Sequence, residues 1–149
     1  MDFLGKIHPL IIHFPIALFT VYSLFEIISL YVKEKNFERV SLILLGLGIL
    51  FSVWAVMTGD KAFETVRNVL TAEQLKVLEN HEFYATVTMF YYAALLFIKF
   101  FLAVKNKTGG LIKYIYLTMV FIGNIFIYLT GYYGGQLVFN YGIGTAIFK

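Results

Sequence analysis

The chain contains no cysteine among its 149 residues. Disulfide bonds, iron–sulfur clusters, thiolate metal sites and covalent attachment of a c-type haem all require cysteine sulfur, so each of them is excluded. Any metal or haem must then be held by the other ligand types, among which histidine nitrogen is the commonest. The absence of cysteine also removes the usual indicator of redox compartment.

Charged residues are scarce. Asp, Glu, Lys and Arg make up 14% of the chain, whereas a soluble domain carries about 25%. Hydrophobic residues reach 60%, and the mean hydropathy is +0.78. The net charge of +3 is small and gives no indication of nucleic-acid binding. These values place the chain among membrane proteins, and we expect one domain over residues 1–149 with no separate soluble domain.

Four long apolar runs account for most of the sequence. They cover residues 9–32, 40–58, 83–104 and 111–133, each close to the roughly 20 residues that cross a hydrocarbon core. Apolar and polar residues do not alternate within them, which argues against a membrane β-barrel. The first run lacks a basic flank or an A-x-A site, so we expect it to remain in the mature protein. The fold class predicted is all-α, a four-helix transmembrane bundle.

The polar segment 59–82 is also predicted to be helical in part. "KAFETVRNVL" spaces its apolar residues as one face of a short amphipathic helix between the second and third spans. Thr71-x-x-Gln74 is a capping-box pattern, and neither Gly nor Pro follows until Val104 has been passed. One helix is therefore expected to begin in water at Thr71 and to continue as the third span.

Lysine and arginine predict the orientation. The turns 33–39 and 105–113 lie on one side of a four-span topology, whereas segment 59–82 is net acidic. Because basic residues concentrate in cytoplasmic turns, we expect both termini and segment 59–82 to be extracytoplasmic. The basic residues of the two turns are Lys33, Lys35, Arg39, Lys105, Lys107 and Lys113.

All three histidines are predicted to lie at this extracytoplasmic face. "KIHPLIIHFPIALF" (6–19) carries His8, His13 and both prolines of the chain, and His81 begins the third span. An imidazole below the headgroup zone is costly without a partner and marks a candidate functional site. Pro9 and Pro15 each lack an N–H, so either the regular helix opens at Pro15 after a bent lead-in, or it starts at Pro9 and is kinked.

Two pairs of polar residues have the same spacing on different spans. Glu26 follows His8 by 18 residues, and Lys99 follows His81 by 18, which is five turns of a helix and therefore one face. If the first span faces the third, His8 approaches His81 at one end while Glu26 meets Lys99 at the other. The bend at Pro15 leaves His13 an equal candidate to face His81.

The histidines favour a b-type haem with two axial imidazoles, because helix bundles build such sites from facing helices. Lys61 and Arg67 are candidate propionate ligands, and the glycine-rich tail supplies Gly134, Gly135 and Tyr141 as further cofactor contacts. Two alternatives stay open. His8, His13 and His81 could together hold Cu or Zn, or interfacial histidines could simply hydrogen-bond to loop backbone.

Four of these segments carry a resemblance to a known family. "IHPLIIHFPIAL" (7–18), the Thr-Gly-x-x-Ala at 58–62, His81 and "GGQLVFNYGIG" (134–144) resemble the prokaryotic membrane family known as domain of unknown function 2231. The resemblance implies a four-helix membrane domain without an established activity. Its members occur fused or adjacent to Rieske and cytochrome c-like proteins, which favours a redox role.

The function expected is that of a membrane cytochrome binding haem b, an electron-transfer protein rather than a stand-alone enzyme. We expect it in the prokaryotic cytoplasmic (inner) membrane, in contact with lipid and without nucleic acid. Quinol or a periplasmic cytochrome c or Rieske-type protein would be the redox partner, and a homo-oligomer is left open. The alternative is a non-haem metal-binding or accessory protein, or a structural subunit.

Overall fold

The computed structural model describes residues 3–32, 35–105, 107 and 109–145, and this part of the chain is helical with no strand. Four segments are long and apolar enough to cross a membrane: Phe3–Ile28, Asn36–Val69, Ala72–Val104 and Leu111–Phe139. The predicted four-span, all-α fold is confirmed. The elements are α1 (Phe3–Ile11), α2 (His13–Ile28), α3 (Lys35–Val66), the 3-10 helix η1 (Arg67–Val69), α4 (Ala72–Val104) and α5 (Leu111–Phe139).

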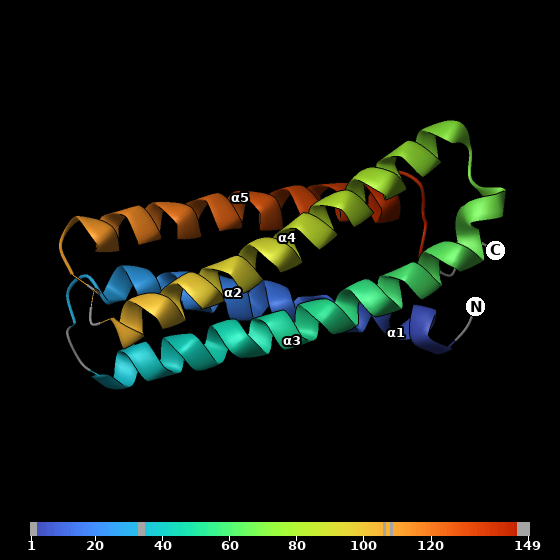
Figure 1. Cartoon of the computed structure of the whole chain (residues 1–149). Coiled ribbons are helices and arrows are strands. Elements are labelled where there is room, and N and C mark those ends of the chain that lie inside the picture. The colour runs from blue at the N-terminus through green and yellow to red at the C-terminus, as the bar shows by residue number, and fades with distance from the viewer. Residues whose placement is uncertain (1–2, 33–34, 106, 108, 146–149) are drawn as a thin grey trace.

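The helices lie side by side along one long axis (Figure 1). Helix α1 begins and α5 ends at the same end of the bundle, which we name the histidine end because His8 and His81 lie there. The α2–α3 and α4–α5 connections lie at the opposite end, named the basic end for Arg39, Lys105, Lys107 and Lys113. Lys33 of the predicted basic turn lies outside the described residues.

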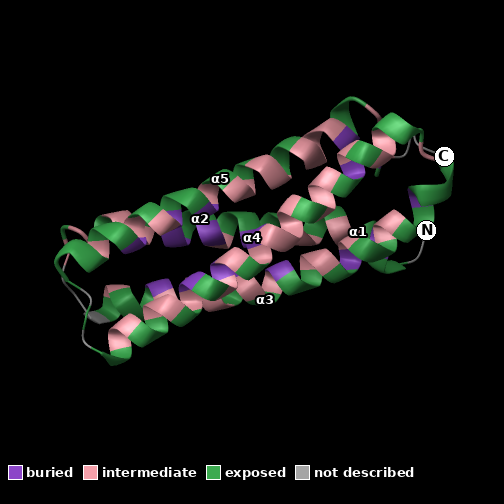
Figure 2. Ribbon diagram, turned by 45° about the horizontal axis from the view of Figure 1, so that its top comes forward, coloured by how far each residue is buried: buried purple, intermediate pink, exposed green. Residues whose placement is uncertain are grey.

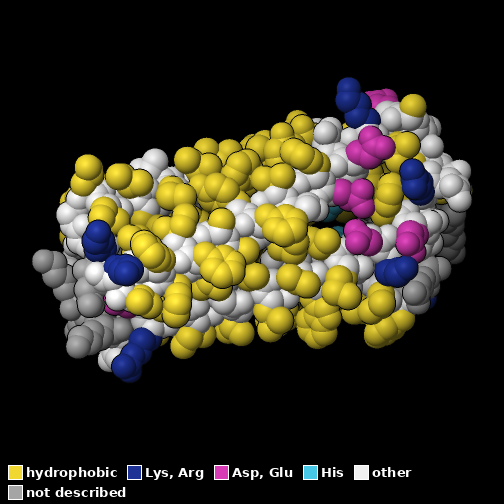
Figure 3. All heavy atoms as spheres, in the orientation of Figure 1, with side chains coloured by type: hydrophobic (Ala, Val, Ile, Leu, Met, Phe, Trp, Pro, Cys, Tyr) yellow, Lys and Arg dark blue, Asp and Glu magenta, His cyan; other side chains and the backbone are white. Residues whose placement is uncertain are grey.

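The bundle has a hydrophobic core that contains some buried polar side chains, and its outer surface is largely apolar. Tyr22 and Tyr92 are fully buried, while large apolar side chains such as Trp54 are exposed along the length of the helices (Figures 2 and 3). An exposed apolar belt of this extent is unfavourable in water and is what a lipid-facing surface requires. The buried serine and threonine side chains of the described residues are Ser23, Ser41, Ser52, Thr58 and Thr88.

The first span is a kinked helix. The chain turns at Ile12 between α1 and α2, although the Ile12 backbone keeps helical angles of φ −59° and ψ −25°. Pro15 has no N–H to bond the carbonyl of Ile11, which is the physical reason for a break at this point. Of the two geometries that the sequence allowed, the kinked helix with an early start at Phe3 is observed.

The polar segment between the second and third spans is more helical than predicted. Helix α3 does not end near residue 58 but runs to Val66, and η1 then leads to Thr71. The predicted capping box is confirmed, since the Thr71 side chain accepts from the Gln74 N–H and the Gln74 side chain accepts from the Thr71 N–H. Likewise α5 continues to Phe139 instead of ending near residue 133.

Two glycines flank an aromatic stack at the centre of the bundle. Phe19 of α2 and Tyr92 of α4 are stacked, with ring centroids 3.8 Å apart. A Cβ added at Gly48 of α3 would lie 2.5 Å from Phe19 Cε1, and one at Gly123 of α5 would lie 2.9 Å from Tyr92 Cζ. Both rings therefore need a glycine on the neighbouring helix.

Gly48→Ala is expected to destabilise the protein by about 1–3 kcal/mol, because overpacking forces the Phe19 ring to move. Gly46→Ala is the matched control, since a Cβ at Gly46 meets nothing within 4 Å and gains the same helix propensity of about 1 kcal/mol. Unfolding of the two variants in mixed micelles, followed by fluorescence, measures the difference. Equal stabilities for the two variants would contradict this account of Gly48.

The predicted pairing of Glu26 with Lys99 is confirmed. The Lys99 ammonium donates to the Glu26 carboxylate, which also accepts from the Ser41 hydroxyl. The side chains of Glu26 and Lys99 are 9% and 14% exposed. This buried pair joins α2 to α4 near the basic end, and so it fixes the relative depth of the first and third spans.

Candidate functional site

The histidine pair of α1 and α4 forms the centre of the histidine end. The His8 and His81 rings lie next to each other in a T-shaped arrangement, with centroids 6.4 Å apart and planes at 81°. Both side chains are half-buried. The common spacing of His8 to Glu26 and of His81 to Lys99 therefore predicted both contacts between the first and third spans.

Thr58 fixes the His8 ring. The Thr58 hydroxyl lies 2.9 Å from the Trp54 carbonyl and 3.0 Å from that of Ala55, so it donates its single proton to the backbone. It can then only accept from His8 Nδ1, which lies 3.1 Å away. His8 consequently carries its proton on Nδ1, which leaves the lone pair on Nε2.

His81 is fixed in the same way by α5. Its Nδ1 lies 3.0 Å from the Thr130 carbonyl, which can only accept, so Nδ1 is again the protonated nitrogen. The Thr130 hydroxyl also meets that of Thr88 at 3.1 Å, which ties α4 to α5 beside the ring. The lone pair of the His81 ring is therefore on Nε2. Each imidazole thus has a proton on a hydrogen-bonded Nδ1 and a lone pair on Nε2, which is the form in which histidine binds metals.

Glycines allow the close packing of both imidazoles. A Cβ at Gly59 would lie 3.1 Å from His8 Cε1, and one at Gly134 would lie 3.0 Å from His81 Cε1. Gly134 was a predicted cofactor contact, and it contacts the histidine itself. Gly59, Thr58 and Thr130 were not predicted as site residues, although Thr58 and Gly59 begin the Thr-Gly-x-x-Ala segment that marked the resemblance.

His13 is separate from the pair. It is the first residue of α2, after the kink, and it is exposed. Over the described ranges, no three His, Cys, Asp or Glu side chains lie close enough together to hold a metal ion. The structure thus brings together two of the three predicted histidines, and the three-histidine cluster is not assembled in this part of the chain.

The predicted propionate ligands lie at the histidine end but have local partners. Lys61 pairs with Glu64 at 2.8 Å. The Arg67 guanidinium lies over the Phe63 ring, 5.4 Å from its centroid. Both cations are exposed, so each can still rearrange toward an anionic group.

The tail residues serve mainly to hold the end of α5. A Cβ at Gly135 would meet only Phe139, at 3.9 Å. The Tyr141 hydroxyl donates to Glu73 in the first turn of α4, and this hydrogen bond raises the pKa of the Tyr141 phenol. Gly142, at φ +68°, allows the chain to turn back so that Ile143 packs in a cluster with Val66, Leu78 and Leu137.

An acidic rim surrounds the opening to the pair. Figure 3 shows a recess at this end in which histidine is visible between acidic side chains. Glu82 of α4 interacts electrostatically with Asp60 of α3, with Glu79 one turn earlier on α4, and with Arg67. We name Asp60, Glu79 and Glu82 the acidic rim. Because α3 and α4 diverge here (Figure 1), the rim lies on both sides of the recess and attracts cations toward it.

A comparison with protein families identifies the chain. The family model described as Predicted membrane protein (DUF2231) matches residues 5–147. The chain belongs to this family. The match extends over all four spans, both histidines of the pair and the glycine-rich tail, so the DUF2231 protein is a multi-pass membrane protein. No curated protein and no solved structure matches it.

Proposed function

We propose that this DUF2231 protein is a membrane electron-transfer protein in which His8 and His81 are the two axial ligands of a b-type haem. The observation that supports the proposal is the pair of neighbouring imidazoles from the first and third spans, each with Nδ1 hydrogen-bonded to an acceptor. An Nδ1–H that donates to a carbonyl or hydroxyl fixes the tautomer and raises the basicity of the liganding nitrogen.

The distance between the rings supports ligands on opposite sides of a metal. With metal–nitrogen bonds of about 2.0 Å and about 1.1 Å from each nitrogen to its ring centre, two opposed imidazoles have centroids about 6 Å apart. Two imidazoles of a tetrahedral ion lie closer, at about 5 Å. The observed 6.4 Å matches the opposed arrangement, which is that of haem axial ligands.

In this proposal each part of the site has a role in holding the haem. Haem supplies one-electron redox chemistry when bound. His8 and His81 hold it from two spans, and Thr58 and the Thr130 carbonyl orient the two rings. Gly59 and Gly134 give the imidazoles room to lie against α3 and α5. The buried interior around Thr88 limits water beside the rings, which favours fast electron transfer without protonation of the ligands.

We propose that the site faces the extracytoplasmic side of the prokaryotic inner membrane, because the basic turns of the opposite end would then lie in the cytoplasm. A redox partner would approach the acidic rim from that side. Quinol within the membrane, or a periplasmic cytochrome c or Rieske-type protein, has the chemistry to exchange electrons there. The acidic rim favours a partner with a basic surface around its own redox centre.

A copper ion is the second candidate occupant. The acidic rim attracts a cation and opposes the propionates of haem, and imidazole suits copper. Two opposed imidazoles also match a two-coordinate cuprous ion. Zinc is less well matched, because the rings are farther apart than two ligands of a tetrahedral ion.

The cofactor content of the purified protein tests the proposal. The full chain is expressed with added haem precursor, purified in an uncharged detergent, and analysed for haem as the pyridine complex and for metals by mass spectrometry. One haem per chain is expected. Stoichiometric copper without haem would identify copper, the second candidate, as the occupant of the site. A protein free of both after reconstitution would leave the histidines as hydrogen-bonding residues only and would contradict the proposal.

Gly134→Ala is expected to weaken cofactor binding by about tenfold or more, as loss of a supporting group around a ligand does. The new Cβ would lie 3.0 Å from His81 Cε1 and would displace the ring. Gly131→Ala, one turn earlier on α5, meets nothing within 4 Å and is the matched control. Haem titration of both apoproteins measures the difference, and equal affinities would show that Gly134 has no such role.

A further inference from the structure

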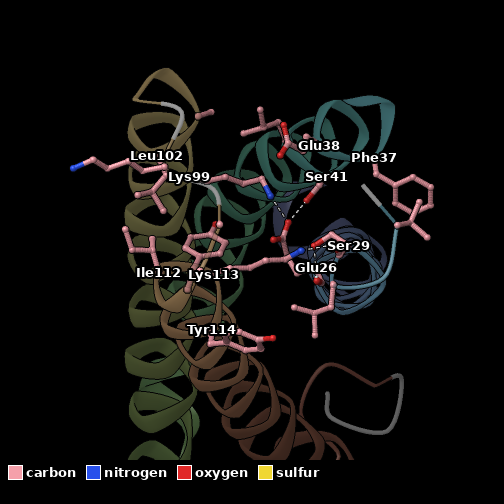
Figure 4. Close-up of a pocket in the computed structure, with 18 residues that line it drawn as sticks. Glu26, Ser29, Phe37, Glu38, Ser41, Lys99, Leu102, Ile112, Lys113 and Tyr114 are labelled. Atoms are coloured by element: carbon pink, nitrogen blue, oxygen red, sulfur yellow. Dashed lines mark hydrogen bonds and ion pairs between the residues drawn. The ribbon is translucent and has the colours of Figure 1, made fainter. Parts of the chain in front are cut away.

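The basic end contains a second candidate site, independent of the histidine pair. A cavity of about 690 Å³ lies between the last turns of α2 and α4 and the first turns of α3 and α5 (Figure 4). Its lining includes Glu26, Ser41, Lys99, Lys107, Lys113 and Tyr116. A volume of this size is typical of a small-molecule site, and nothing in the histidine site makes use of it.

The lining of the cavity carries a net positive charge, after the ion pair between Glu26 and Lys99 is set aside. Glu26 is paired with Lys99, and the Lys99 ammonium also lies over the Tyr116 ring at 5.6 Å from its centroid. Among the described residues of the lining, Glu38 is the other acidic one. The two positive charges of Lys107 and Lys113 exceed the single negative charge of Glu38, so this part of the described lining has an excess of positive charge.

The two remaining lysines have donors available. The Lys113 ammonium donates one proton to the Ser29 carbonyl, and an ammonium has three. The Lys107 side chain is exposed, and no side-chain partner is recorded for it within the described part of the chain. Figure 4 shows Lys113 directed into the space between the helix ends, toward the same side as Glu26 and Ser29.

The start of α5 adds to this field. Gly110, its N-cap residue, lies on the cavity wall and provides no side-chain cap. The first N–H groups of a helix without a cap lack partners, and the helix dipole places about half a positive charge there. Lys113 and this helix start therefore both contribute positive potential to the cavity, and Lys107 lies on its lining.

We propose that this cavity binds a phosphate group, with Lys107 and Lys113 as its cationic ligands. Phosphate offers several strong acceptor oxygens to ammonium and backbone donors together. Basic pockets between the cytoplasmic ends of membrane helices bind lipid headgroups in this way. Free phosphate has the same chemistry, so the source of the group is decided by the experiment.

Thermal unfolding of the full chain in maltoside detergent provides the assay, after delipidation. Inorganic phosphate and phosphatidylglycerol are titrated separately. A saturable rise in Tm is expected with phosphatidylglycerol, and Lys113→Ala is expected to raise the apparent Kd about tenfold, as loss of a charged hydrogen bond does. Lys105→Ala is the matched control, because Lys105 lies at the same end over the Phe101 ring and does not line the cavity.

The outcomes separate the two sources. A rise with both titrants, weakened by Lys113→Ala, supports a phosphate site that accepts the free anion. A rise with the lipid alone, weakened in the same way, supports a headgroup site. No saturable rise, or equal weakening by Lys105→Ala, would overturn the proposal. Lys107→Ala repeats the test with an exposed residue, in case Lys113→Ala does not fold. None of these results depends on haem or copper at the histidine end.

Discussion

His81→Ala is expected to abolish the low-spin haem spectrum of the reduced protein. Removing one of two axial imidazoles costs more than losing an outer hydrogen-bonding group, which already weakens metal binding by about 10–100-fold. The remaining His8 would give a five-coordinate haem of low affinity, or none. Reduced-minus-oxidised visible spectra of variants purified in parallel, normalised to protein, measure the loss. His8→Ala is expected to give the same result.

His13→Ala is the matched control for this prediction. It removes the same side chain from the same face of the membrane, but His13 is exposed and lies beyond the kink at Ile12. Its spectrum is expected to equal that of the wild type. If His13→Ala lost the low-spin bands while His8→Ala kept them, His13 would be the ligand and the pairing of His8 with His81 would have no role in cofactor binding.

Glu26→Gln is expected to destabilise the bundle by about 3 kcal/mol, at the lower end of the range for breaking a buried ion pair. The substitution keeps the shape of the side chain but leaves the Lys99 ammonium without its counter-charge in an apolar surrounding. The cavity beside Lys99 and the Tyr22 and Tyr116 rings beneath it moderate the cost. Reversible unfolding in mixed micelles measures it.

Two further variants test whether the destabilisation by Glu26→Gln comes from loss of the ion pair with Lys99. Glu26→Gln combined with Lys99→Met removes both charges and is expected to recover most of the loss, so the double-mutant cycle gives a coupling of about 1–3 kcal/mol. Glu64→Gln breaks the exposed pair with Lys61 and is expected to cost less than about 1 kcal/mol. Additive effects of the Glu26 and Lys99 substitutions would mean that the two charges do not stabilise one another.

The sequence was sufficient to predict the parts of the fold that depend on periodicity. Apolar length gave the four spans, and Thr71 with Gln74 gave the start of α4. The common 18-residue spacing predicted His8 beside His81 and Glu26 beside Lys99, because 18 residues make five helical turns. The Ile12 backbone keeps helical angles, so the kink in the first span preserves that relation. Both contacts are present, so one packing arrangement satisfies both predictions.

Other features depend on contacts that a single sequence does not contain. The phase of His13 was open because a proline near a helix start permits either a kink or a late beginning, and only the position of the turn at Ile12 decides between them. Helix α3 extends to Val66 because that residue packs with Leu78 and Ile143 from distant segments. The anchoring of His81 by the Thr130 carbonyl and the cavity at the basic end follow from how the helices are placed relative to one another.

The electron paramagnetic resonance spectrum of the oxidised wild-type protein tests the central claim most directly. Two imidazoles bound to one ferric haem give a low-spin signal, and ring planes near the observed 81° give it a large g anisotropy. The account predicts that signal, in an amount equal to the haem content. A high-spin ferric signal would show that the histidines do not both bind the iron. A cupric signal without haem, or no signal at all, would contradict a haem between His8 and His81.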